Sequence, residues 1–247
     1  MNINVLLTPA ELPKSSQNGE RVAIVIDVLR ASTTICVAIS SGAQAILPSP
    51  SVEEAAELFQ ALPRSIRLLG GERHGIRQPG FDVGNSPLEY LPDVVEGKII
   101  SFTTSNGTQA LHLVREADSI YIGSFMNMQS LASYIADKHT SPDLDVTIIC
   151  AGSNGHFSLE DAVCAGGYAG YLQAFMQEAV LTDSAVAAEQ LFSVYTEDLL
   201  DFLHNTSHGK YLDSLGFSDD IECAADLNSL DVVPVLSGDS IIAATLT

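Results

Sequence analysis

Charged side chains follow several apolar stretches of this 247-residue chain, where strands would end. The first is Asp27, which closes a run of Val and Ile and precedes Arg30 by three residues. A carboxylate next to a buried strand loses hydration energy, so we expect Asp27 to have a structural or functional role that compensates for this cost. We expect Asp27 to bind Mg²⁺ or to attack an electrophile, with Arg30 binding an anionic substrate. Capping of a helix that starts near Ala31 is the alternative.

A second group of polar side chains lies in residues 70–87, a stretch with five glycines and two prolines. Long segments of this kind are usually functional or disordered. Arg73 and Arg77 could bind one anion between them, because a guanidinium makes paired contacts with phosphate, sulfonate or carboxylate. Glu72, Asp82 and Asn85 offer the oxygen ligands that Mg²⁺ prefers. We therefore place a metal and anion site here.

Two similar motifs follow the strands expected at residues 99–102 and 146–150. Each motif reads Ser-Asn-Gly and precedes a helical pattern, which favours an anion-binding helix start over an Asn-Gly hairpin turn. Two neighbouring acids follow the second motif and are either metal ligands or acids that stabilise a helix start. The chain contains neither a Walker loop, G-x-x-x-x-G-K-S/T, nor a G-x-S-x-G nucleophile elbow. The residues concerned are Ser105, Asn106 and Gly107, Ser153, Asn154 and Gly155, and Glu160 and Asp161.

Histidines and cysteines give weaker signals. His74, His156 or His208 could protonate a leaving group, and the sequence does not choose between them. The four cysteines are far apart and form no C-x-x-C pair, so we expect reduced, buried thiols and neither a disulfide nor a zinc site. Cys150 could be exposed by the glycine-rich stretch after it, but burial in the core is the favoured interpretation.

The elements that must position these residues alternate along the chain. Apolar runs predict strands over residues 22–28, 66–69, 99–102, 120–122 and 146–150. Helical patterns cover residues 51–61, 108–114, 128–136 and 161–175, and residues 182–215 look mainly helical. We predict a three-layer α/β/α fold with a largely parallel or mixed sheet and two lobes around a cleft. One domain is expected over residues 1–247, with a lobe boundary near 140–145 and an edge strand over 241–246.

The charge of the chain restricts its partners. The net charge is −20, but residues 1–115 carry only −2 and the rest carries −18. So negative a surface repels nucleic acids and anionic membranes, whereas a small anionic phosphorylated substrate can still bind to the arginines of the first part. No apolar run approaches the length of a membrane span and the first residues do not resemble a signal peptide, so we expect a cytoplasmic protein. Among protein partners we consider a second copy of the chain, which would give a homodimer.

Four segments together resemble the 2-phosphosulfolactate phosphatase family. They read V-I-D-V-L-R-A-S-T-T, G-G-E-R-x-G-x-x-x-x-G-F-D-x-G-N-S-P, T-T-x-N-G-T and C-A-G-x-x-G-x-x-x-x-E-D-x-x-C-A-G, in this order over residues 20–170. The S-H-G around His208 and the region of Asp239 are similar too. The resemblance marks these site candidates: Asp27, Arg30, Glu72, Arg73, Gly80, Asp82, Asn85, Asn106, Gly107, Glu160 and Asp161.

The resemblance implies a Mg²⁺-dependent enzyme that hydrolyses 2-phosphosulfolactate to sulfolactate and phosphate, on the route to coenzyme M. Asp27 then serves as a metal ligand or attacks phosphorus, and we favour the ligand role because the D-x-D signature of aspartyl-phosphate enzymes is absent. Two alternatives remain. One is a phosphatase for another small phosphorylated acid, and the other is a protein that binds anionic metabolites without catalysis.

Overall fold

Eleven strands form one mixed sheet in the computed structural model, which describes residues 1–11 and 19–245. Their order across the sheet is β5-β4-β6-β3-β11-β10-β7-β2-β8-β1-β9. The strands are β1 (Asn2–Leu6), β2 (Arg21–Ile26), β3 (Ala45–Pro48), β4 (Arg67–Arg73), β5 (Ile76–Arg77), β6 (Ile99–Thr103), β7 (Ser119–Gly123), β8 (Asp145–Cys150), β9 (Val180–Leu181), β10 (Pro234–Ser237) and β11 (Ser240–Ala243).

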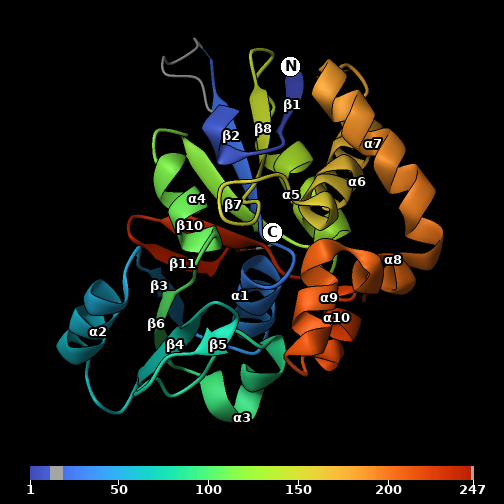
Figure 1. The fold of residues 1–247 in the computed structure, drawn as a ribbon. Helices are drawn as coiled ribbons and strands as arrows, with labels where there is room; N and C mark the ends of the chain where they lie inside the picture. The colour runs from blue at the N-terminus through green and yellow to red at the C-terminus, as the bar shows by residue number, and fades with distance from the viewer. Residues whose placement is uncertain (12–18, 246–247) are drawn as a thin grey trace.

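The sheet consists of two blocks of parallel strands with a hairpin between them. The first block contains β4, β6 and β3, and the second contains β7, β2, β8, β1 and β9. The hairpin of β10 and β11 pairs antiparallel with both blocks, through Val235 with Tyr121 and through Ile241 with Ile46. Three antiparallel pairings therefore separate β3 from β7, so the two blocks run in opposite directions. The hairpin crosses the middle of the molecule between them (Figure 1).

Helices cover both faces of the sheet because its central strands are apolar on both sides. In β2, Ile24 and Ile26 face a core with α5, α6 and α7, whereas Ala23 and Val25 face a second core with α1 and α4. The helices are α1 (Ala31–Ser40), α2 (Val52–Ala61), α3 (Pro92–Val95), α4 (Gly107–Leu113), α5 (Met128–Lys138), α6 (Leu159–Phe175), α7 (Asp183–Tyr195), α8 (Leu199–Asn205), α9 (Ser207–Ser214) and α10 (Ser218–Ala224). This is the predicted three-layer α/β/α arrangement.

The expected strands and helices are confirmed within a few residues of their bounds. The helix expected from residue 51 is α2, and the Ser51 hydroxyl accepts a hydrogen bond from the Glu54 N–H at 3.1 Å, as a helix cap should. In contrast, the stretch after residue 69 is not all loop, because β4 continues through Glu72 and then pairs with β5.

The prediction of an edge strand over residues 241–246 is wrong. Strand β11 lies inside the sheet, because its hairpin partner β10 covers one side and β3 covers the other. Leu246 itself lies outside the described residues. Residues 140–145 run from α5 into β8, and the division of the chain near this point stays a prediction. Within the described ranges, no helix combines the length and apolarity needed to cross a lipid bilayer.

Candidate functional site

A cavity of about 510 Å³ opens where strands of both blocks end. Asp27 follows β2, Glu72 belongs to the end of β4, and the loops after β6 and β8 complete this wall, while α9 forms the opposite one. The loops of both blocks thus meet at one site although the blocks run in opposite directions. Nine of the residues predicted from the sequence line it: Asp27, Arg30, Glu72, Asn85, Ser105, Asn106, Ser153, Asn154 and Glu160.

Asp27 is a buried carboxylate in this wall, with 6% of its surface exposed. The pKa of Asp27 is raised to about 6, mainly by burial; the nearby charge of His208 lowers it, and the charges of Glu72 and Glu160 raise it. Gly107 makes room for it, since a Cβ there would lie 2.8 Å from Oδ2 of Asp27. The loop after β6 can therefore approach this carboxylate only with glycine at position 107.

Glu72 joins two loops of the site. Its carboxylate accepts hydrogen bonds from the Gly75 N–H at 2.7 Å and from the Ser105 N–H at 2.8 Å. The Ser105 hydroxyl is 3.3 Å from the same carboxylate. These donors are engaged by Glu72, so Ser105 does not present the free anion-binding N–H that the sequence predicted.

Glu160 and His208 form an ion pair across the cavity. Oε1 of Glu160, at the start of α6, lies 3.4 Å from Nδ1 of His208 on α9. Burial raises the pKa of Glu160, but hydrogen bonds from His208, Ser158 and the backbone, together with the charge of His208, lower it more, so the net pKa is lowered. His208 and His74 line the cavity. His156 is not among the described lining residues, so His74 and His208 remain as candidate proton donors.

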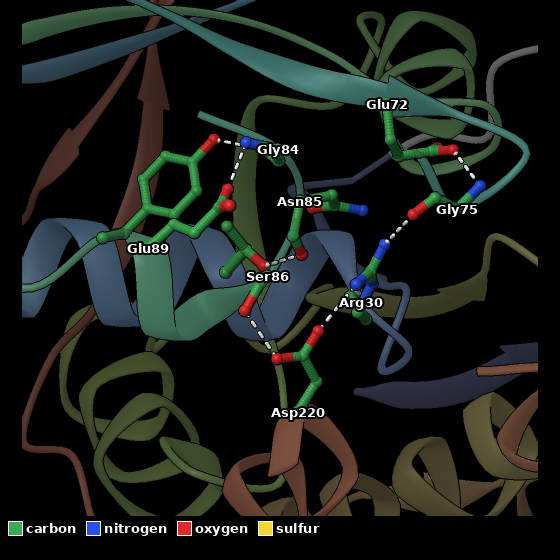
Figure 2. A network of polar contacts seen from close by, with 10 residues as sticks. Arg30, Glu72, Gly75, Gly84, Asn85, Ser86, Glu89 and Asp220 are labelled. Carbon is green, nitrogen blue, oxygen red and sulfur yellow. Dashed lines mark hydrogen bonds and ion pairs between the residues drawn. The ribbon is translucent and has the colours of Figure 1, made fainter. Parts of the chain in front are cut away.

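Arg30 makes a buried ion pair that the sequence did not predict. Its Nη1 is 2.6 Å from Oδ2 of Asp220 on α10, and its Nη2 donates to the Gly75 carbonyl at 2.6 Å (Figure 2). The guanidinium also lies 4.2 Å from the ring centroid of Phe217. Asp220 resembles any acid in the first turn of a helix, and 190 residues separate it from Arg30. No local pattern signals such a pair.

The loop after β8 departs from the prediction of a helix start. The N–H groups of Ser153 and His156 each donate to the other residue's carbonyl at 3.0 Å. Asn154 and Gly155 have φ of 52° and 78°, so residues 153–156 form the Asn-Gly turn that the sequence disfavoured. Helix α6 begins only at Leu159. The Asn154 N–H donates to Oδ1 of Asn106 at 3.0 Å, so the two Ser-Asn-Gly motifs do meet.

The three arginines that we expected to bind anions, Arg30, Arg73 and Arg77, do not lie together in the described cavity lining. Arg73 donates to the Glu72 carbonyl at 2.7 Å and to the Thr103 hydroxyl at 2.8 Å, whereas exposed Arg77 donates to the Asp82 carbonyl at 3.1 Å. Of the three, Arg30 alone is among the described lining residues. The hairpin of β4 and β5 explains this, because its strands carry Arg73 and Arg77 to contacts outside the cavity.

Two further predicted metal ligands, Asp82 and Asp161, bind backbone N–H groups as Glu72 does. Asp82 is exposed, and its Oδ2 accepts the Leu69 N–H at 2.9 Å. Asp161 is buried and accepts the N–H groups of Val28 at 2.9 Å and Gly152 at 3.0 Å, which joins the ends of β2 and β8. Burial raises the pKa of Asp161 well above its usual value, and Asp27 and Glu160 add to this effect. Neither carboxylate lines the cavity within the described residues.

We expect Asp161→Ala to lower the free energy of unfolding by about 2–4 kcal/mol, because two buried N–H groups lose their acceptor. Urea denaturation would measure this change. Asp82→Ala is the matched control and should cost less than about 1 kcal/mol, since its acceptor group is exposed. Equal stability of the Asp161 variant and the wild type would refute the structural role.

The cavity offers oxygen atoms that suit Mg²⁺, although fewer than predicted. Among the described residues, no three His, Cys, Asp or Glu side chains are arranged as a metal cluster. However, Oδ1 of Asn85 is buried without a hydrogen-bond partner in the described chain, and it belongs to the same lining as Asp27 and Glu160. Mg²⁺ typically takes one or two carboxylates and fills its remaining positions with water and substrate oxygens. These residues fit such a site.

The sequence also matches known proteins over almost its whole length. Residues 6–239 match the family model described as 2-phosphosulpholactate phosphatase. The chain belongs to this family. A protein of Symbiobacterium thermophilum is 41% identical over 94% of this chain and 97% of its own length, and its name is "Probable 2-phosphosulfolactate phosphatase". A relative with the same name in Thermotoga maritima is 39% identical over 87% of this chain and 89% of its own length. Another in Clostridium beijerinckii is 34% identical over 95% of this chain and 96% of its own length.

Proposed function

We propose that the chain is a Mg²⁺-dependent phosphatase that converts 2-phosphosulfolactate and water to sulfolactate and phosphate, on the route to coenzyme M. The observation that carries this proposal is the cavity in which the buried carboxylate of Asp27 lies with Arg30, the Glu160–His208 pair and the Asn85 oxygen, which has no partner among the described residues. The names of the relatives support the choice of substrate. Phosphate transfer requires positioned positive charge and an activated oxygen nucleophile, and these side chains can supply both.

Asp27, Asn85 and Glu160 are the residues that would hold the metal. Bound there, Mg²⁺ would neutralise charge on the phosphoryl oxygens. Arg30 binds a phosphoryl oxygen and stabilises the charge that develops on it. Asp27 could instead attack phosphorus. The stereochemistry at phosphorus distinguishes these roles, because direct attack by water inverts a chiral phosphate, whereas two successive displacements through Asp27 retain its configuration, and retention would contradict the ligand role.

His208 is our candidate for the proton donor to the leaving oxygen. It lines the cavity, and Glu160 lies 3.4 Å from its Nδ1, which leaves the other ring nitrogen to face a ligand. A carboxylate partner of this kind orients an imidazole for proton transfer. His74 also lines the cavity, but it is exposed and no carboxylate holds its ring among the described contacts.

The test is a phosphate-release assay with 2-phosphosulfolactate, phospholactate and phosphoglycolate. We expect release from 2-phosphosulfolactate, its loss in EDTA to less than about 1% of the starting rate, and its recovery when Mg²⁺ is added back, since metal coordination contributes several kcal/mol to such reactions. Full turnover in EDTA would refute the metal requirement. Release from none of the substrates, together with thermal stabilisation by one of them, would favour a binding protein.

One observation favours a second candidate, a phosphatase for a less charged acid. Arg30 is the single Arg or Lys in the described lining, whereas 2-phosphosulfolactate carries a phosphate, a sulfonate and a carboxylate. A substrate with two anionic groups, such as phosphoglycolate, asks for fewer positive partners. A higher kcat/KM for phosphoglycolate than for 2-phosphosulfolactate in the same assay would favour this candidate.

A further inference from the structure

Asp220 lies directly behind the cavity wall. It is 2% exposed and is absent from the described lining, whereas its partner Arg30 belongs to that lining. Its Oδ2 lies 2.6 Å from Nη1 of Arg30. The carboxylate therefore contacts the guanidinium from the side away from the cavity, and it does not compete with a ligand for the space inside.

The second oxygen of Asp220 holds a different part of the wall. Oδ1 accepts a hydrogen bond from the Ser86 hydroxyl at 2.5 Å. Ser86 follows Asn85, whose unpartnered amide oxygen is the candidate metal ligand. Figure 2 shows Asp220 between Ser86 and Arg30, with both contacts drawn from one carboxylate. One side chain on α10 thus connects the anion-binding and the metal-binding parts of the cavity.

The contacts of Arg30 leave donors for a ligand. Arginine has five N–H groups, and the described contacts of Arg30 with other residues use one on Nη1 and one on Nη2. Phe217 restricts the plane of the guanidinium from one face. With two nitrogens and one face fixed, the remaining donors have a defined direction, and a fixed guanidinium binds phosphate with less loss of side-chain entropy.

We propose that Asp220 is a positioning residue, which is held by the Ser86 hydroxyl and orients the Arg30 guanidinium for the phosphate of the substrate. This inference rests on the proposed role of Arg30 in phosphate binding. Neither Asp220 nor α10 belongs to the segments that carry the family resemblance. Asp220 acts through Arg30 and does not itself touch the substrate.

A double-mutant cycle on phosphate binding tests the proposal. The affinity for inorganic phosphate is measured by calorimetry for the wild type, Asp220→Asn, Arg30→Met and the double variant. We expect Asp220→Asn to weaken phosphate binding about tenfold when Arg30 is present and to have no further effect in the Arg30→Met background, because residues in direct contact are energetically coupled. A structural brace would instead weaken binding equally in both backgrounds, and that result would overturn the proposal.

Matched variants separate positioning from loss of fold. Asp213→Asn removes a carboxylate on neighbouring α9 that pairs with His204 at 2.9 Å, outside the described cavity lining, and should bind phosphate like the wild type. If Asp220→Asn does not fold, Ser86→Ala replaces it, since this variant keeps the ion pair and removes only one contact of Asp220. We then expect about threefold weaker phosphate binding, again only when Arg30 is present. An unchanged affinity would overturn the proposal.

The same measurements keep this inference distinct from the proposed function. Wild-type protein that binds phosphate in the cycle as expected, but hydrolyses no substrate, would support the role of Asp220 and refute the hydrolase. Hydrolysis by the wild type together with additive effects of the two substitutions would support the hydrolase and refute the role of Asp220. Wild-type protein that binds no phosphate would overturn the role of Asp220, whereas the phosphate-release assay would still decide the hydrolase.

Discussion

Asp27→Asn should reduce phosphate release by about 10³-fold or more, because the amide removes the charge through which we propose that Asp27 holds Mg²⁺ or attacks phosphorus. The substitution keeps the shape of the side chain, so it tests the charge and not the packing. Steady-state kinetics with 2-phosphosulfolactate and saturating Mg²⁺ would measure the effect. Activity within about tenfold of the wild type would remove Asp27 from the chemistry.

The same substitution should stabilise the protein at neutral pH. The pKa of Asp27 is raised from 3.8 to about 6, so between these values the folded state binds more protons than the unfolded state. Stability therefore falls as the pH rises through this window, and above pH 6 the charged, buried carboxylate costs about 3 kcal/mol. The amide that replaces this carboxylate does not titrate, so the variant should be more stable than the wild type at pH 8.

The pH dependence makes this expectation specific. The advantage of Asp27→Asn should be full above about pH 6 and should disappear as the pH falls toward 3.8, because Asp27 of the wild type is then protonated in both states. Thermal unfolding at pH 4, 6 and 8 without added metal would measure it. A variant less stable than the wild type at pH 8 would contradict the electrostatic account.

Arg30→Met should weaken both phosphate binding and the fold. The substitution removes the single Arg or Lys of the described cavity lining, so we expect kcat/KM to fall about 10²–10³-fold. It also leaves Asp220 buried without its cation, which typically costs about 3–5 kcal/mol. Steady-state kinetics and urea denaturation measure the two effects separately.

Arg77→Met is the matched control, since it removes the same charge at an exposed position outside the described lining. It should leave kcat/KM within about threefold of the wild type and change stability by less than about 1 kcal/mol. If Arg77→Met weakened activity as much as Arg30→Met, the assignment of Arg30 as the anion-binding arginine would be wrong. A stable but inactive Arg30 variant would argue against the buried pair as a source of stability.

Much of the site could be predicted because short-range sequence patterns indicate which residues line it. Asp27 ends an apolar strand, and the carboxyl ends of parallel strands are where ligands bind, so its place in the cavity follows from composition and spacing. Glu72 and Asn85 also line the cavity as predicted from their long, glycine-rich stretch. The strands β2, β6, β7 and β8 were predictable for the same reason, since each is a short, buried, apolar run.

The rest depends on contacts between distant residues. Arg73 and Arg77 follow an apolar stretch, as Arg30 does, so their side chains alone do not distinguish them from it. The pairing of β4 with β5 directs Arg73 and Arg77 elsewhere. Asp161 looks like a metal ligand in sequence, but its carboxylate accepts hydrogen bonds from two backbone N–H groups, 9 and 133 residues away. The place of β11 inside the sheet follows from pairing with β3, which precedes it by almost 200 residues.

The central hairpin has a consequence for the order in which the protein is made. Strands β10 and β11 connect the two blocks of the sheet, yet residues 234–243 leave the ribosome after every strand that they join. Until then, a growing chain can form each block but cannot hold the two together through the sheet, and Asp220 and His208 also arrive late. During synthesis the cavity is therefore assembled last, so a nascent chain gains the proposed phosphate site only when nearly complete.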